Sequence, residues 1–153
     1  MFEMRNYYKK ISLKIPARLH LDVMNIQKLN EGKIGGGGIG IAIKCNLYIY
    51  VEVISAEKDI IEAIKPNLVK FYLDLIRANL NIDKKFHVIC KVDKELKAHG
   101  GMGSNALVQL GVVYSINCLF NNPLNEAQLI DFLHQNYYED DNGIVTNKVF
   151  AQE

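Results

Sequence analysis

The stretch AHGGMGSNALVQLGVVYSINCLF, residues 98–120, contains no Asp, Glu, Lys or Arg. It opens with glycines around a serine and passes directly into an almost wholly apolar run. That run, residues 106–120, is shorter than the roughly 20 residues a membrane span requires, and it includes Gln109, Ser115 and Asn117. The stretch therefore predicts a buried helix that is entered through a glycine turn.

The turn itself, HGGMGSN at residues 99–105, follows an alternating segment at residues 84–92 that predicts a strand. Glycine is favoured where a ligand must approach the main chain closely, and a helix start presents unpaired N–H groups at a positive dipole end. Ser104 and Asn105 add side-chain donors, so the turn suits phosphate or pyrophosphate. It is neither a Walker A motif nor a dinucleotide fingerprint. A tight turn with Ser104 as an ordinary N-cap explains these residues equally well.

Outside this stretch, period-two alternation predicts strands over residues 8–26, broken at Pro16, and over residues 39–54. The GGGG run at residues 35–38 predicts a flexible loop between them. Helical spacing predicts a helix over residues 67–80, with Asn67 as a candidate cap, and another that starts at Asn125. The order β-β-β-α-β-α-α indicates a single α+β domain without repeats or linkers.

Composition excludes several classes of protein. The 153 residues include 18 Lys and Arg against 17 Asp and Glu, so the net charge of +1 does not favour nucleic-acid binding. No signal peptide or membrane span is expected, because the N-terminus MFEMRNYYKKISLK carries charge where an apolar segment is needed. Three widely spaced cysteines predict reduced core thiols in a cytoplasmic protein.

Three segments occur in an order that resembles a known family: IPARLHLDVMNI at residues 15–26, GKIGGGGIGIAI at 32–43 and AHGGMGS at 98–104. The last resembles the phosphate loop of the GHMP superfamily of small-molecule kinases and their relatives. Together they are most similar to the β-ribofuranosylaminobenzene 5'-phosphate synthases, which have a Pro-x-Arg-Leu-His strand and a His shortly before the loop. The resemblance covers roughly residues 12 to 120 of the chain.

The resemblance implies a ribosomal-protein-S5-like α+β domain, in which a sheet packs on a buried helix that follows a Gly-rich phosphate turn. It further implies a transferase that condenses phosphoribosyl pyrophosphate with a hydroxy- or aminobenzoate, in methanopterin-type cofactor biosynthesis, with Mg²⁺ as the cofactor. By position, Arg18 and His20 are the implied catalytic residues. The implied phosphate-binding residues are Gly101, Gly103, Ser104 and Asn105, with His99 beside them.

The chain departs from the superfamily pattern in two ways. Lys97 stands where the motif usually has Pro, and Asn105 replaces a Ser or Gly. Family members have about two domains, so we expect that this chain, residues 1–153, holds the N-terminal domain without the second. The alternatives are a kinase of the same superfamily that binds ATP, and a non-catalytic domain that acts as a homodimer or with a complementary second half. A phosphorylated small molecule is the expected ligand of either enzyme.

Arg18 and His20 lie two apart on a predicted strand and so point to one face, where Asp22 would continue the row. A guanidinium and an imidazole can hold a phosphate or a carboxylate. The alternative is a solvated face, with Ala17, Leu19 and Leu21 filling the core opposite it. Asp22 is expected to pair with Arg18 rather than to bind a metal.

The remaining titratable residues are expected to be structural. His87 lies in an apolar run and His134 in the last predicted helix. The acidic residues 139–141 are expected to form a solvated turn, while Tyr137 and Tyr138 beside them are expected to pack.

Overall fold

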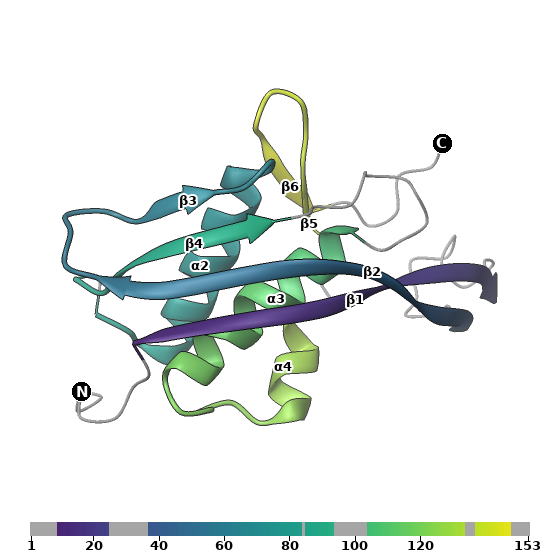
Figure 1. Ribbon diagram of the computed structural model, residues 1–153, viewed down its shortest axis with the longest axis horizontal. Helices are drawn as coiled ribbons and strands as arrows, with labels where there is room; N and C mark the ends of the chain where they lie inside the picture. The colour runs from purple at the N-terminus through teal and green to yellow at the C-terminus, as the bar shows by residue number, and fades with distance from the viewer. Residues whose placement is uncertain (1–8, 25–36, 84, 94–103, 134–136, 148–153) are drawn as a thin grey trace.

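The computed structural model describes residues 9–24, 37–83, 85–93, 104–133 and 137–147. Over these residues the chain is an α+β domain, as the sequence predicts (Figure 1). The elements in chain order are β1 (Lys10–Met24), β2 (Gly37–Ile54), β3 (Ile60–Glu62), α2 (Pro66–Leu80), β4 (His87–Asp93), α3 (Ser104–Leu119), α4 (Glu126–Leu133), β5 (Tyr137–Glu139) and β6 (Val145–Asn147).

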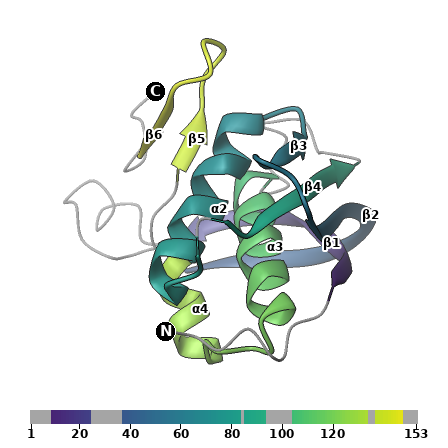
Figure 2. The same ribbon diagram turned by 90° about the vertical axis from the view of Figure 1, so that its left-hand side faces the viewer.

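The main sheet has the strand order β1-β2-β4-β3. β2 is antiparallel to both β1 and β4, whereas β3 runs parallel to β4 and is joined to it through α2. Helices α2 and α3 lie against one face of this sheet and α4 lies beside α3 (Figures 1 and 2). Between the layers the core is formed by alternate residues of the central strands and the apolar faces of the helices, among them Leu47, Ile49, Val51, Tyr72 and Ile116.

Pro16 does not break the first strand, so the predicted interruption there is wrong. β1 runs through it, with a register shift between Pro16 and Arg18. A proline is tolerated because β1 is an edge strand, where one side of the backbone needs no partner in the sheet. Ala17 continues the inward-facing positions 11, 13 and 15 and is fully buried between exposed neighbours.

Two further differences concern the sheet. β2 begins at Gly37, so the second half of the GGGG run pairs with β1 rather than forming a loop, and Gly35 and Gly36 lie outside the described residues. β3 was not predicted at all, because three residues are too few for alternation to be visible.

Helix α2 begins one residue earlier than expected, with Pro66 in its first turn and Lys65 at the N-cap, so the assignment of Asn67 as cap is wrong. Asn67 instead donates from Nδ2 to the carbonyl of Gly143 at 2.9 Å. The N–H of Leu68 donates to Glu139 Oε2 at 2.7 Å. Glu139 is therefore buried at the start of α2, which corrects the expectation of a wholly solvated turn.

Helix α3 is the buried helix that the sequence predicts, and its three buried polar residues are each hydrogen-bonded. Gln109 donates to the carbonyl of Phe132, Ser115 donates to Gly111 O at 2.7 Å, and Asn117 binds both backbone groups of Leu124. Gln109 thus ties α3 to α4 and Asn117 ties it to the connection between the two helices, while the bond of Ser115 stays within α3. No helix in the described part of the chain is long and apolar enough to cross a membrane.

Of the C-terminal elements, the start of α4 follows from a local signal, whereas the short strands β5 and β6 were not predicted. Asn125 Oδ1 accepts the N–H of Gln128 while Gln128 Oε1 accepts the N–H of Asn125, a reciprocal cap that starts α4 where predicted. Tyr137 packs on the rings of Phe71 and Tyr72, which confirms its packing role and docks the β5–β6 hairpin on α2.

All three cysteines are free. Cys90 is fully buried, whereas Cys45 and Cys118 are half-buried, so the predicted core position holds fully for Cys90 alone.

Candidate functional site

The candidate phosphate site is the start of α3. This helix begins at Ser104, as the motif predicts, and its first described side chain, Asn105, is half-buried. Gly101, Gly103 and His99 lie outside the described residues, and only the backbone of Ser104 is described. The structure thus confirms a helix that starts directly after the predicted turn in the sequence. The roles of these residues in binding a ligand stay predictions.

The start of α3 differs from the starts of the other two described helices. In α2 the carboxylate of Glu139 binds the first turn, and α4 carries Glu126 in its own first turn. The first turn of α3 has no acidic residue. Free N–H groups and the helix dipole favour an anion at a helix start, and α3 has no acidic residue of its own in its first turn to take that place.

Arg18 lies on β1 opposite Ala42 and is exposed. The pairing is regular from Arg18 to His20, whose partner is Gly40, so positions 18 and 20 alternate as the sequence argument requires. A Cβ added at Gly40 would lie 3.7 Å from Arg18 Cδ, so the stem of Arg18 runs alongside this glycine. Of the three residues expected to fill the core opposite them, Ala17 is buried, Leu19 is 40% exposed, and the side chain of Leu21 lies outside what the structure describes.

The row does not continue to Asp22. A second register shift falls between His20 and Asp22, and Asp22 is opposite Ile39. Because the shift interrupts the alternation of the strand, the prediction that Asp22 extends the face of Arg18 is wrong.

The start of α3, the C-terminal end of β1 and the N-terminal end of β2 lie toward the same side of the molecule (Figure 1). This arrangement follows from the close packing at Gly111, where α3 touches Ile15 of β1 and Ile49 of β2. Arg18 and Asn105, both described, do not hydrogen-bond to each other. The structure brings their elements together without joining the two side chains.

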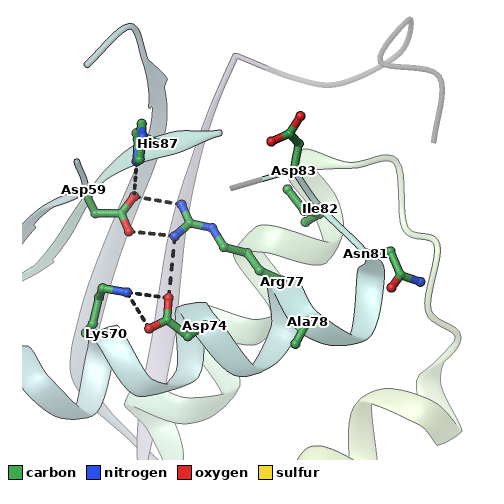
Figure 3. Close-up of a pocket in the computed structure, with 9 residues that line it drawn as sticks. All are labelled: Asp59, Lys70, Asp74, Arg77, Ala78, Asn81, Ile82, Asp83 and His87. Atoms are coloured by element: carbon green, nitrogen blue, oxygen red, sulfur yellow. Dashed lines mark hydrogen bonds and ion pairs between the residues drawn. The ribbon is translucent and has the colours of Figure 1, made fainter. Parts of the chain in front are cut away.

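A pocket that the sequence did not reveal lies at the C-terminal end of α2, beside β3 and β4 (Figure 3). Its volume is about 800 Å³. At its centre Arg77 holds Asp59 through two hydrogen bonds of 2.6 and 2.8 Å and donates to the carbonyl of Phe86 at 2.8 Å. His87 Nδ1 lies 3.8 Å from Asp59 Oδ1, which fits the structural role expected for His87, whereas His134 lies outside the described residues.

Four charged residues of this pocket, Asp59, Lys70, Asp74 and Arg77, form one network of ion pairs. Burial alone would raise the pKa of Asp59, but hydrogen bonds from Arg77 and from the N–H of Val88, with the charges of Arg77 and Lys70, lower it. Lys70 in turn pairs with Asp74. The network joins α2 to β3 and β4, and the only sequence signal for it is the i, i+4 pair on α2.

Comparison with known proteins gives a consistent family. Residues 67–143, half of the chain, match the family model described as the GHMP kinases N-terminal domain. Among proteins of curated function no match is found.

Solved structures of low sequence identity share the fold. Homoserine kinase from Cytophaga hutchinsonii is 18% identical with a TM-score of 0.61, over 87% of this chain and 42% of that one. Mevalonate kinase from Methanococcus jannaschii is 14% identical with a TM-score of 0.64, over 86% and 46%. Phosphomevalonate kinase from Streptococcus pneumoniae is 15% identical with a TM-score of 0.59, over 83% and 40%. The chain spans less than half the length of each of these structures.

Proposed function

The chain belongs to the GHMP kinase N-terminal domain family, and from that premise we propose that it is the nucleotide-phosphate-binding part of a small-molecule kinase. In this proposal the turn at residues 99–105 holds the phosphates of ATP at the start of α3. A kinase requires little covalent chemistry from the protein, because positioning and charge stabilisation carry most of the catalysis of phosphoryl transfer.

The observation that carries the proposal is the first turn of α3, which has no acidic residue while Glu139 and Glu126 serve the starts of α2 and α4. Phosphate oxygens would accept hydrogen bonds from the backbone N–H groups of that turn, and the side-chain amide of Asn105 can add another donor. The three solved structures named above are titled as kinases, which supports ATP over other phosphorylated ligands.

Mg²⁺ belongs to this proposal as the partner of the nucleotide. No group of three or more His, Cys, Asp or Glu side chains among the described residues could hold a metal ion. Mg²⁺ is commonly bound through substrate phosphates with only one or two carboxylates, so such a cage is not needed. When bound, the ion would neutralise phosphate charge. The chain's own part is to orient the phosphates at α3.

A second candidate is the transferase that uses phosphoribosyl pyrophosphate. It rests on the Pro-x-Arg-Leu-His strand, where Arg18 is exposed and positions 18 and 20 alternate regularly. In this candidate Arg18 and His20 would act on the sugar phosphate, and α3 would hold the pyrophosphate. We rank it second because the solved structures of this fold named above are titled as kinases.

Ligand binding tests both candidates. Isothermal titration of the 153-residue chain with Mg-ATP should show binding, and titration with phosphoribosyl pyrophosphate should not. Asn105→Asp puts a carboxylate into the first turn of α3 and should raise the Kd for Mg-ATP about tenfold, which is about 1.4 kcal/mol. Asn79→Asp, the same change at an exposed position of α2, should leave the Kd unchanged and serves as the control.

Binding of phosphoribosyl pyrophosphate without binding of ATP would replace the kinase by the transferase. If neither ligand binds at about 1 mM, a concentration that reveals even weak sites, the non-catalytic alternative stands in their place.

A further inference from the structure

Strands β1 and β2 continue beyond the rest of the sheet as a two-stranded arm (Figure 1). β4 pairs with β2 only from Tyr48 to Ile54, so in the described part of the chain residues 37–42 of β2 pair with β1 alone. This arm carries three exposed aliphatic side chains, Leu19, Ile39 and Ile41, which are 40%, 54% and 52% exposed. We call these three residues the aliphatic surface.

Strand alternation places the aliphatic surface on the side of the sheet that the helices cover. Ala17 is fully buried, and Leu19 lies two residues further along β1. Ile41 is the Cα partner of Leu19, and residues directly opposite each other in an antiparallel pair share a face. Ile39 is two residues from Ile41 on β2 and continues the same face. The face thus changes from buried to exposed between Ala17 and Leu19, where the cover by the described helices ends.

The aliphatic surface lies just beyond the start of α3. This helix packs on the sheet at Gly111, beside Ile15 and Ile49. From Gly111 back to Ser104 the helix axis spans about 10 Å, and from Ile15 to Leu19 the strand spans about 13 Å. Because the start of α3 lies toward the C-terminal end of β1, the surface begins where the helix ends (Figure 1).

We propose that the aliphatic surface binds the hydrocarbon part of the phosphoryl acceptor, and that this acceptor is an alcohol with an aliphatic body. The inference rests on the proposed function, in which the phosphates of ATP bind at the start of α3. An acceptor whose hydroxyl meets the terminal phosphate there has its remaining atoms beside the arm. Exposed aliphatic side chains favour an apolar ligand group, because both surfaces leave water on contact.

The reaction with such an alcohol is an ordinary phosphoryl transfer. The acceptor oxygen bonds to the γ-phosphorus of ATP, and the bond from that phosphorus to the bridging oxygen of ADP breaks. The hydroxyl proton is released, so the products are an alkyl phosphate and ADP. The alkyl phosphate carries both groups that the site would recognise, a phosphate for α3 and a hydrocarbon for the arm.

The adenine of ATP is the other group that could lie on this surface. Bases are bound by stacking on rings and by hydrogen bonds to their edges. The side chains of Leu19, Ile39 and Ile41 offer neither a ring nor a polar group. Arg18 alternates with Leu19 and so belongs to the opposite face of β1. The surface therefore suits a hydrocarbon better than a base.

An NMR titration with two alkyl phosphates tests the proposal. Isopentyl phosphate is an analogue of the expected product, and methyl phosphate matches it without the hydrocarbon body. Both should shift the amide signals of Asn105 and Ala106 in the first turn of α3, whereas only isopentyl phosphate should shift the methyl signals of Leu19, Ile39 and Ile41. The Kd of isopentyl phosphate should be about tenfold lower, because its longer chain leaves water against the arm.

Substitutions on the arm give the second part of the test. Leu19→Ser and Ile41→Ser should each raise the Kd of isopentyl phosphate about fivefold and leave that of methyl phosphate unchanged. Ile144, which is 56% exposed between β5 and β6, supplies the matched control, because Ile144→Ser should change neither Kd. Circular dichroism should show native helix content in all three variants.

Equal Kd values for the two phosphates overturn the inference, while shifts at the start of α3 would still support the proposed function. If methyl phosphate, isopentyl phosphate and Mg-ATP all leave those amide signals unchanged, the proposed function fails and this inference with it. Tighter binding of isopentyl phosphate that persists in Leu19→Ser and Ile41→Ser also overturns it. Methyl shifts with adenosine but not with isopentyl phosphate would assign the surface to the base, and a dimer that Leu19→Ser dissociates would assign it to a second copy.

Discussion

Glu139 Oε2 accepts the backbone N–H of Leu68 at 2.7 Å, although 71 residues separate them in the sequence. Lys65, the N-cap residue of α2, makes no side-chain cap bond of its own. A carboxylate from the β5–β6 hairpin thus serves the start of α2 and fixes the hairpin to it.

Glu139→Ala should therefore destabilise the chain by about 1–2 kcal/mol, because it removes both a cap and a charge that favours the helix dipole. Glu139→Gln keeps an acceptor oxygen without the charge, so its free energy of unfolding should lie between those of Glu139→Ala and the native chain. Urea unfolding measures both, and an unchanged midpoint for Glu139→Ala would show that other contacts hold the hairpin.

Asp59→Asn should cost about 3 kcal/mol at neutral pH, because it removes the closer counter-ion of the almost buried Arg77 guanidinium and leaves only Asp74, 3.9 Å away. The pKa of Asp59 is lowered in the folded chain, so its stabilisation is fully present above the ordinary value of 3.8 and is lost as the pH falls through the folded value. The free energies of unfolding of variant and native chain, measured against pH, should thus converge only on the acid side of 3.8. A constant gap down to the lowest pH would contradict the ion pair.

Gly111→Ala should destabilise the chain by about 1–3 kcal/mol, because its Cβ would lie 2.2 Å from Ile49 Cδ1 and 2.6 Å from Ile15 Cδ1. Shortening one neighbour should relieve the crowding. In a double-mutant cycle with Ile49→Val, the combined variant is expected to be more stable than the sum of the two single effects predicts. Strict additivity would mean that α3 moves away from the sheet instead.

Arg18→Ala should leave the free energy of unfolding within about 0.5 kcal/mol of the native value, because the side chain is exposed. If Arg18 contacts the bound phosphorylated ligand, the same variant should raise the ligand's Kd about tenfold, whereas Arg18→Lys should lose less. Titration calorimetry with Mg-ATP and chemical unfolding of each variant separate the two effects. A weakened fold with unchanged binding would return Arg18 to a structural role.

The three thiols should react at different rates with iodoacetamide. Cys90 is fully buried, and its pKa is raised to about 12. Burial is the main cause, the charge of Asp59 adds to it, and the charge of Arg77 opposes it. Cys45 and Cys118 are half-buried. Mass spectrometry of the native chain should find them alkylated before Cys90, and the order should disappear in denaturant.

Much of this fold is encoded locally and could be predicted. The uncharged run after the glycine turn gives α3, apolar spacing gives α2, and alternation gives β2 and β4, because each signal lies within one element. The start of α4 follows from Asn125 and Gln128 three residues on.

The errors arise where distant segments decide the outcome. Pro16 is acceptable only because β1 lies at the sheet edge, a property of strand order rather than of the neighbouring residues. The bond from Leu68 to Glu139 and the pair of Arg77 with Asp59 join segments that no local pattern connects. Within the candidate site, the placement of α3 and the regular pairing at Arg18 were predictable, whereas the register shift before Asp22 was not.

The bonds that Gln109 and Asn117 make outside α3 would have a thermodynamic consequence for any ligand at the start of this helix. With Gln109 bonded to α4, Asn117 bonded to the connection before α4, and Gly111 packed against the sheet, the helix would keep its orientation when a ligand binds. The entropy of aligning its first amides is therefore lost when the chain folds rather than when an anion arrives. A preorganised site of this kind binds without reorganisation, so more of each phosphate contact becomes affinity.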